Sequence, residues 1–214
     1  MSRTSKGSAG AHQRKVTVWL VAAGLIVVGL VLSACGGRTA STATGNETGA
    51  SDIVTLAYDP TDGTLLKADH QGLFRQRAHS NWENVHVPQA SGLSSVVLNP
   101  DQPATLYVSG PGLGVLRSDN GGQHWQTVNT GLPSLDVAAL ALHSFRRETL
   151  YVWLNGDGIY RTEDGGANWK RMPDQGPPDT HVRGLTHSTL PGSMNTGWLY
   201  AATPTGAYLS MDCF

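Results

Sequence analysis

The sequence predicts an all-β fold in which a unit of about 44 residues recurs, each unit supplying four short strands. One observation is a direct internal repeat, because residues 114–125 and 158–169 correspond position by position at an offset of 44. The other is composition, because 26 Gly and 11 Pro among 214 residues, without a long helical pattern after the N-terminus, indicate frequent turns. Four strands in this length are typical of one blade of a β-propeller.

Each unit carries the same elements in the same order. A short buried strand such as 105–108 or 149–152 is preceded by another apolar run. A strand that starts at Gly and a Gly-Gly turn follow it, and we expect the last strand around the Trp that ends the unit. Weaker copies start at Gly72, with Trp82 near the end, and at Gly206. The other expected strands are 54–58, 64–66, 95–98, 137–142, 182–185 and 198–201.

The Gly-Gly turn carries a family resemblance. Residues 162–169 fit the pattern Ser/Thr-x-Asp-x-Gly-x-x-Trp, residues 118–125 fit it with Asn120 in place of Asp, and residues 210–212 begin a further copy. The pattern resembles the Asp-box, or bacterial neuraminidase repeat, of sortilin-like ectodomains, a photosystem II assembly factor and exo-sialidases. The turn residues that this resemblance implies are Ser118, Asn120, Gly122, Trp125, Thr162, Asp164, Gly166, Trp169, Ser210 and Asp212.

The residue types of this turn have structural reasons. An Asp or Asn side-chain oxygen accepts hydrogen bonds from turn N–H groups, and a Ser or Thr hydroxyl satisfies another backbone group. The second Gly adopts φ values that are closed to other residues, and the Trp buries its ring against a neighbouring hairpin or blade. We therefore interpret Asp164 as a residue that stabilises the turn and not as a catalytic acid.

The N-terminus is typical of an exported lipoprotein. Four basic residues lie in the first 15 positions, residues 16–32 carry no charge, and Leu-Ser-Ala-Cys follows, ending at Cys35. This run resembles the bacterial lipobox, which implies a diacylglycerol on the Cys35 thiol and cleavage before it. An uncleaved signal-anchor helix is the alternative. Both interpretations place the remainder at the cell membrane, facing outside the cytoplasm.

Three regions follow from these signals: a signal peptide over 1–35, a flexible Gly/Ser/Thr tether over 36–51, and a repeat domain over 52–214. From residue 53 the chain holds about 3.7 units, which predicts a partial β-propeller of three to four four-stranded blades after an N-terminal apolar signal helix. Three explanations are a truncated or frameshifted chain, a partial propeller completed by self-association, and a four-bladed ring. The last copy of the motif breaks off after residue 212, which favours truncation.

The predicted function is display of a non-catalytic, membrane-anchored module that binds a protein or a glycan. From Cys35 onward 11 Lys and Arg stand against 16 Asp and Glu without a basic stripe, which argues against nucleic-acid binding. No His or Cys spacing is diagnostic of a metal site, so neither a metal nor a cofactor is expected.

A fragment of an Asp-box glycoside hydrolase is the alternative, and a decayed remnant is a third interpretation. A sialidase-like enzyme would need an arginine cluster, and a xyloglucanase-like enzyme would need two carboxylates across the central cleft. Arg75, Arg117, Arg161 and Arg183 recur on the strands, but Arg117 and Arg161 take equal repeat positions and are interpreted as features of the repeat. Asp136 and Asp157 are the candidate carboxylates.

Overall fold

The computed structural model describes residues 53–78, 80–173, 176–178, 181–188 and 197–210. These residues all belong to the second of two units into which the chain divides, Glu47–Phe214. The predicted signal peptide, Cys35 and the tether lie outside the described residues. Within the described residues all the regular structure is strand, and no helix there is long and apolar enough to cross a membrane.

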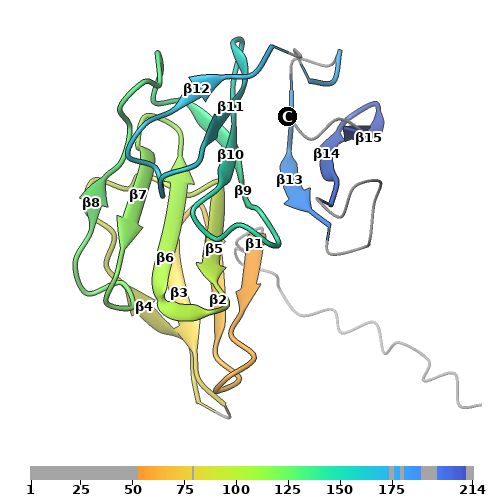
Figure 1. The fold of residues 1–214 in the computed structure, drawn as a ribbon. Helices are drawn as coiled ribbons and strands as arrows, with labels where there is room; N and C mark the ends of the chain where they lie inside the picture. The colour runs from red at the N-terminus through yellow and green to blue at the C-terminus, as the bar shows by residue number, and fades with distance from the viewer. Residues whose placement is uncertain (1–52, 79, 174–175, 179–180, 189–196, 211–214) are drawn as a thin grey trace, which may run out of the picture. The chain divides into compact units, whose positions relative to one another are not determined.

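The strands form four antiparallel sheets, and each sheet is one blade of a β-propeller, as predicted (Figure 1). In each sheet the strands lie side by side in chain order, and blade 4 has three strands among the described residues. Blade 1 holds β1 (Ile53–Tyr58), β2 (Leu65–Asp69), β3 (Gly72–Gln76) and β4 (Glu83–Val85). Blade 2 holds β5 (Ser95–Asn99), β6 (Gln102–Gly110), β7 (Gly114–Ser118) and β8 (Gln126–Thr127). Blade 3 holds β9 (Val137–Leu142), β10 (Leu150–Leu154), β11 (Gly158–Thr162) and β12 (Lys170–Arg171), and blade 4 holds β13 (Gly184–His187), β14 (Leu199–Thr203) and β15 (Gly206–Ser210).

The outermost strands differ from the sequence expectation. They were expected around the Trp of each unit, but β8 and β12 begin directly after Trp125 and Trp169. The backbone explains the difference, because the N–H of Trp169 donates to the Thr130 carbonyl (2.8 Å), in the connection from the preceding blade. The backbone N–H of Trp169 is therefore paired outside its own sheet.

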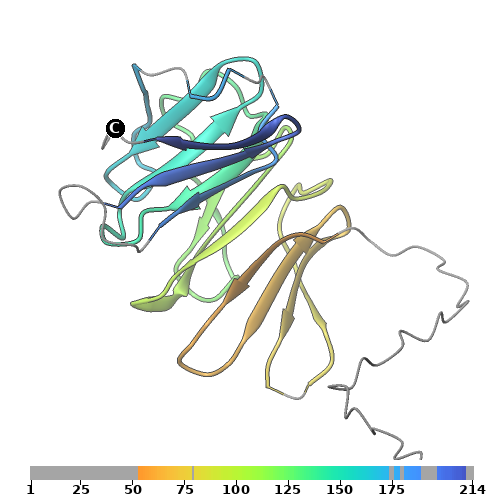
Figure 2. The ribbon, with the colours of Figure 1, turned by 90° about the vertical axis from the view of Figure 1, so that its right-hand side faces the viewer.

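The first strand of each blade lies beside the first strand of the next. β5 contacts β1, β9 contacts β5, and β13 contacts β9, so these four innermost strands follow one another around the inside (Figure 1). Figure 2 shows blades 3 and 4 lying one over the other. Because each blade starts with its innermost strand, equivalent positions of the repeat recur at equivalent places in successive blades.

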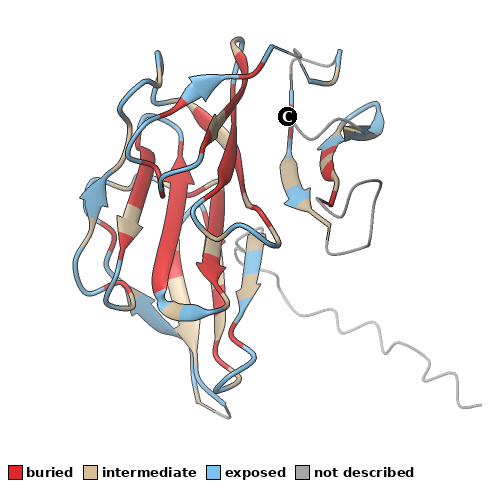
Figure 3. Cartoon of the chain, viewed as in Figure 1, coloured by how far each residue is buried: buried red, intermediate tan, exposed pale blue. Residues whose placement is uncertain are grey.

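The hydrophobic core is divided among the junctions between blades. Alternation along the strands sends successive side chains to opposite faces, so each blade contributes to the junctions before and after it. In β9, for example, Leu140 packs in the junction of blades 2 and 3, whereas Ala139 and Ala141 pack in that of blades 3 and 4. The middle strand β10 is buried throughout, and β6 is buried from Thr105 to Gly110 (Figure 3). Burial between blades therefore supplies the main stabilisation.

Candidate functional site

The Gly-Gly turn of blade 2 is held by two side chains. The Ser118 hydroxyl accepts hydrogen bonds from the backbone N–H groups of Asn120 (3.3 Å) and Gly122 (2.8 Å). The Asn120 Oδ1 accepts the N–H of His124 (2.8 Å). These bonds join the two ends of the turn through side-chain oxygens.

The turn of blade 3 repeats this arrangement with a carboxylate. The Thr162 hydroxyl accepts the N–H of Gly166 (3.1 Å), and Asp164 Oδ1 accepts the N–H of Asn168 (2.8 Å). Hydrogen bonds from the Thr162 hydroxyl and from the side chain and backbone of Asn168 lower the pKa of Asp164 to about 2. These donors occupy the carboxylate oxygens, so its environment is that of a turn-stabilising group.

The second Gly of each turn permits a close approach between blades. Gly122 and Gly166 adopt φ values of 85° and 94°. A Cβ atom would lie 2.7 Å from Val85 Cγ1 at Gly122 and 2.9 Å from Val128 Cγ2 at Gly166. Val85 belongs to the blade before Gly122, and Val128 directly follows the blade before Gly166. Both the backbone angle and the contact therefore exclude a side chain at these two glycines.

The two Trp side chains lie in equivalent places. Trp125 Nε1 donates to the His86 carbonyl (3.0 Å), and Trp169 Nε1 donates to the Val128 carbonyl (2.6 Å). Each acceptor follows the outermost strand of the preceding blade. Trp82 is 39% exposed, because the described residues contain no blade before its own. Of the remaining predicted turn residues, Ser210 ends β15 and Asp212 lies outside the described residues.

The recurring arginines connect neighbouring blades. Arg75 Nη2 donates to the Gly121 carbonyl, and Arg117 Nη1 donates to the Gly165 carbonyl (3.5 Å), in each case in the turn of the next blade. Arg161 pairs with Glu163 at 3.1 Å, and the N–H of Arg183 donates to the Ala202 carbonyl next to it in the sheet. The structure therefore spreads Arg75, Arg117 and Arg161 over successive blades instead of gathering them around one anion.

The two candidate acids lie in blade 3. Asp136 Oδ2 accepts the Asn155 side-chain N–H (3.2 Å), and Asp157 Oδ2 accepts the Tyr160 hydroxyl (2.7 Å). Asp157 also pairs with Arg171 at 3.7 Å. Both carboxylates accept hydrogen bonds within the connections of blade 3, and neither lines the groove described next.

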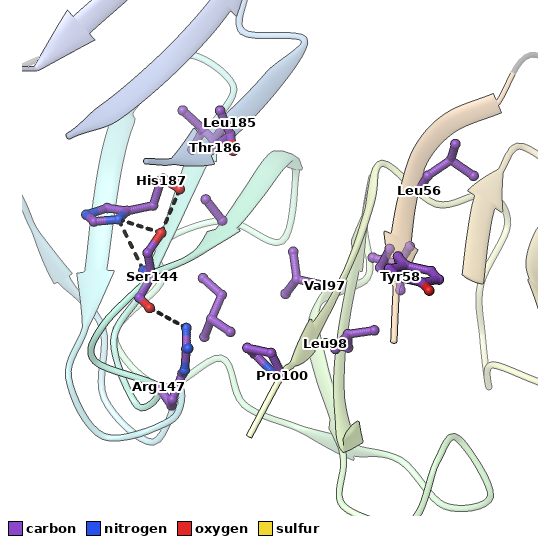
Figure 4. Close-up of a pocket in the computed structure, with 14 residues that line it drawn as sticks. Leu56, Tyr58, Val97, Leu98, Pro100, Ser144, Arg147, Leu185, Thr186 and His187 are labelled. Carbon is purple, nitrogen blue, oxygen red and sulfur yellow. Dashed lines mark hydrogen bonds between the residues drawn. The ribbon is translucent and has the colours of Figure 1, made fainter. Parts of the chain in front are cut away.

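A groove of about 360 Å³ lies where the four innermost strands end (Figure 4). Every blade contributes apolar side chains to it, and none of its 14 lining residues is an Asp or Glu. Its polar groups are Ser144, Arg147, Thr186 and His187. Its apolar lining residues are Leu56, Ala57, Tyr58, Val96, Val97, Leu98, Pro100, Ala141, Leu142 and Leu185.

The polar side of the groove is fixed by hydrogen bonds. His187 Nδ1 accepts the backbone N–H of Ser144 (3.1 Å), and the Ser144 hydroxyl donates to the His187 carbonyl (2.7 Å). Burial lowers the pKa of His187, so its imidazole is neutral at pH 7. Arg147 donates through Nε to Asp101 Oδ2 (2.8 Å), which holds its guanidinium at the edge of the groove. Sequence reasoning missed this groove, because it forms only where four separate strand ends meet.

A second cleft, of about 440 Å³, lies between blade 1 and the turn of blade 2. Asp59, Asp62, Arg75 and Arg77 line it, so opposite charges are mixed. Asp59 Oδ1 accepts the N–H of Thr61 and Asp62 Oδ1 accepts that of Thr64, both at 2.8 Å, so both carboxylates already serve their own turn. Among the described residues no group of three His, Cys, Asp or Glu side chains is arranged to hold a metal ion.

Comparison with solved structures agrees with this architecture. The fold is a β-propeller. The chain is similar to an ancestral GH74 enzyme (TM-score 0.51, 23% identity over 70% of this chain) and to the GH74 enzyme of Niastella koreensis (0.54, 17% over 72%). It is also similar to YCF48 bound to a D1 peptide (0.55, 19% identity over 77% of this chain and 52% of that one). At these identities the similarity concerns the fold alone.

The match covers only part of these propellers. The chain spans 21% of the ancestral GH74 enzyme and 26% of the Niastella koreensis enzyme. No family model matches the chain. No curated protein matches it either.

Proposed function

We propose that this chain is a non-catalytic binding module, anchored at the outer face of the membrane, that takes an extended apolar peptide segment in the groove at the ends of its innermost strands. The observation that carries the proposal is the lining of that groove. Apolar side chains from four blades surround it, with a few fixed polar groups and no carboxylate. Such a lining suits a segment that buries apolar side chains and is oriented by a few hydrogen bonds.

The similarity to YCF48 supports the same proposal, because that propeller is bound to a peptide. The turns of blades 2 and 3, with their Ser or Thr, their Asn or Asp and their Trp, support assigning the chain to the Asp-box propellers. Their residues stabilise the fold in this proposal and take no part in binding.

A fragment of a glycoside hydrolase is the second candidate, supported by the similarity to the two GH74 enzymes. Hydrolysis of a glycosidic bond uses a pair of carboxylates on either side of it. The lining of the groove offers none, and Asp136 and Asp157 serve connections within blade 3. The geometry therefore supports binding better than hydrolysis.

Binding is tested on the full chain in detergent micelles with two fluorescent decapeptides, one rich in Leu and Val and one rich in Ser and Gln. The apolar peptide should bind, and Leu56→Ser and Thr186→Glu should each weaken binding at least tenfold. Both side chains line the groove and both are exposed, so the fold should tolerate the changes. Leu135→Ser, at a 43% exposed position outside the groove, is the matched control.

Equal binding of both peptides, or groove variants that bind as well as wild type, would exclude the groove as the site. Activity is measured separately on xyloglucan and on sialylated substrates. Turnover that disappears in Asp136→Asn or Asp157→Asn would establish the hydrolase interpretation instead.

Anchoring is tested by mass analysis of the protein recovered from membranes. An acylated chain that begins at Cys35 would support the lipoprotein proposal. An uncleaved N-terminus without a lipid would support the signal-anchor helix.

A further inference from the structure

Each blade has two different faces, because alternate side chains of its strands point to opposite sides. We call the side that packs on the preceding blade the leading face and the side that packs on the next blade the trailing face. In blade 2 the leading face buries Val96, Leu98, Val108 and Leu116 against blade 1. The same side of blade 3 packs Leu140, Leu142 and Val152 against blade 2. One type of contact is thus repeated at each junction.

The leading face of blade 1 has the same apolar character but is not covered by any described residue. Leu56 and Tyr58, at the positions of Val96 and Leu98, are 57% and 58% exposed. Trp82, at the position of Trp125, is 39% exposed. Three large apolar side chains, each of which has a buried or half-buried counterpart in blade 2, thus lie on one side of blade 1.

The trailing face of blade 4 is also apolar and uncovered by described residues. Tyr200 pairs with Leu209 in this sheet, as Tyr107 pairs with Arg117 in blade 2. This register makes Leu209 the counterpart of the arginine that each of the other blades carries. Leu209 is 37% exposed, and Ala202 and Ala207 of the same face are exposed.

The polar link between blades is missing from both of these faces. At the first two junctions an arginine of the trailing face, Arg75 or Arg117, donates to a carbonyl of the Gly-Gly turn of the next blade. Blade 4 has Leu209 in place of this donor, and blade 1 has no Gly-Gly pair in the turn before Trp82. The arginine donor is therefore absent from blade 4, so docking would bury no guanidinium without its partner.

We propose that the trailing face of blade 4 in one copy of this chain docks on the leading face of blade 1 in a second copy, continuing the blade-to-blade contact that the chain already makes internally. The contact is heterologous, because it joins two different faces. Two copies close into a ring when blade 4 of each copy docks on blade 1 of the other. Two copies of the four blades that the structure describes would give a ring of eight, within the range of four to eight that propellers use.

Lys67 is compatible with this contact. It takes the position of Val108, and its ammonium lies 4.5 Å from the Phe74 ring and 3.2 Å from the Asp69 carboxylate. Its charge is therefore already neutralised within blade 1. In a docked pair it would face Tyr200, the counterpart of Leu66, so the ring of a tyrosine would cover it.

The association is tested on the full chain in detergent micelles by sedimentation velocity, which gives the number of chains per particle. The wild type should contain two chains. Particles of the Leu209→Arg variant should contain one chain. The new arginine would face a turn of blade 1 that lacks the Gly-Gly pair, and it would lie close to Arg77. Trp82→Asp should also contain one chain. Leu135→Asp, exposed and on neither face, should still contain two.

Mixing the two disruptive variants tests the polarity of the contact. An equimolar mixture of Leu209→Arg and Trp82→Asp should regain particles of two chains, at least tenfold weaker than wild type, because one intact contact remains. A wild type with one chain per particle, variants that remain paired, or a mixture that does not recover would each overturn the proposal. Neither Trp82 nor Leu209 lines the groove, so these two variants test association without changing the groove lining, and Leu56 and Tyr58, which belong to both surfaces, are left unchanged here.

Folding of the variants is checked by near-ultraviolet circular dichroism. Arginine is native at the positions equivalent to Leu209, so the Leu209→Arg variant should fold. If Trp82→Asp does not fold, the number of chains in Leu209→Arg particles decides the test.

Discussion

The imidazole rings of His143 and His187 stack at the junction of blades 3 and 4, with their centroids 3.9 Å apart and their planes inclined by 25°. His143 follows β9, whereas His187 ends β13 at the position that Leu142 takes in β9, so two neighbouring positions of the repeat meet across this junction. His143 Nδ1 accepts the N–H groups of Phe145 (3.0 Å) and Arg146 (3.1 Å), and His187 Nδ1 accepts that of Ser144. These bonds require both rings to be unprotonated at Nδ1.

The pair predicts that the fold is destabilised as the pH falls. Burial, the adjacent His187 and the cations Arg146, Arg147 and Arg161 lower the pKa of His143 from 6.5 to about 4, and burial lowers that of His187. The unfolded chain binds these protons below about pH 6.5, whereas the folded His143 binds one only near pH 4. The folded state is therefore most stable above pH 6.5, and its free energy of unfolding decreases as the pH falls from 6.5 to 4. Urea unfolding at several pH values in this window measures it.

His143→Asn is the matched control for this pH dependence. Blade 2 has Asn99 at the equivalent position, where its Oδ1 accepts the N–H of Asp101 (3.0 Å). The variant should keep the turn but lose the titration, so its unfolding free energy should depend less on pH than that of the wild type. Identical slopes for the two proteins would contradict the assignment to His143.

Gly166 should be intolerant of even a methyl group. Gly166→Ala places a Cβ at a φ of 94° and 2.9 Å from Val128, so we expect a loss of about 3 kcal/mol. Gly156→Ala is the control, because its φ is 78° and no atom lies within 4 Å of the added Cβ, so strain alone should cost about 1 kcal/mol. Chemical denaturation of both variants gives the difference, and equal losses would show that the contact with Val128 does not matter.

The indole N–H of Trp169 should stabilise the junction of blades 2 and 3. Trp169→Phe removes the donor to the Val128 carbonyl and leaves a small cavity at a 4% exposed position, which should cost about 2–3 kcal/mol. Trp125→Phe should cost about 1 kcal/mol, because Trp125 is only half-buried. The two free energies of unfolding are compared under one condition, and a larger loss at Trp125 would refute this ranking.

Asp164 should stabilise the turn as a hydrogen-bond acceptor. Asp164→Ala removes the acceptor for the Asn168 N–H and should cost about 1 kcal/mol. Asp164→Asn should be nearly neutral at pH 7, since Asn120 makes the equivalent bond in blade 2. Because the folded pKa of Asp164 is lowered from 3.8 to about 2, its ionised form stabilises the fold above pH 3.8, and this is lost as the pH falls towards 2. Thermal unfolding at pH 7 and pH 3 tests both statements, and a destabilised Asn variant at pH 7 would contradict them.

Local spacing was sufficient to predict much of the fold. The offset of 44 residues between the two Trp-ended runs predicted repeated blades, and the positive φ of Gly122 and Gly166 agrees with the reason given for Gly there. The first residue of the outermost strand was predicted less accurately, because the backbone N–H of Trp169 bonds to the connection from the preceding blade. That bond joins Trp169 to Thr130, which are remote in the chain, and no local pattern reports it.

The sequence by itself determined the repeated unit, its strands and its turns, because these depend on alternation, on Gly and on short-range hydrogen bonds. Only the tertiary structure decided that Arg75 and Arg117 reach the next blade, that His143 meets His187, and that four strand ends enclose an apolar groove. The physical reason is that these relationships join groups more than 40 residues apart, whose distance depends on how one blade packs against the next.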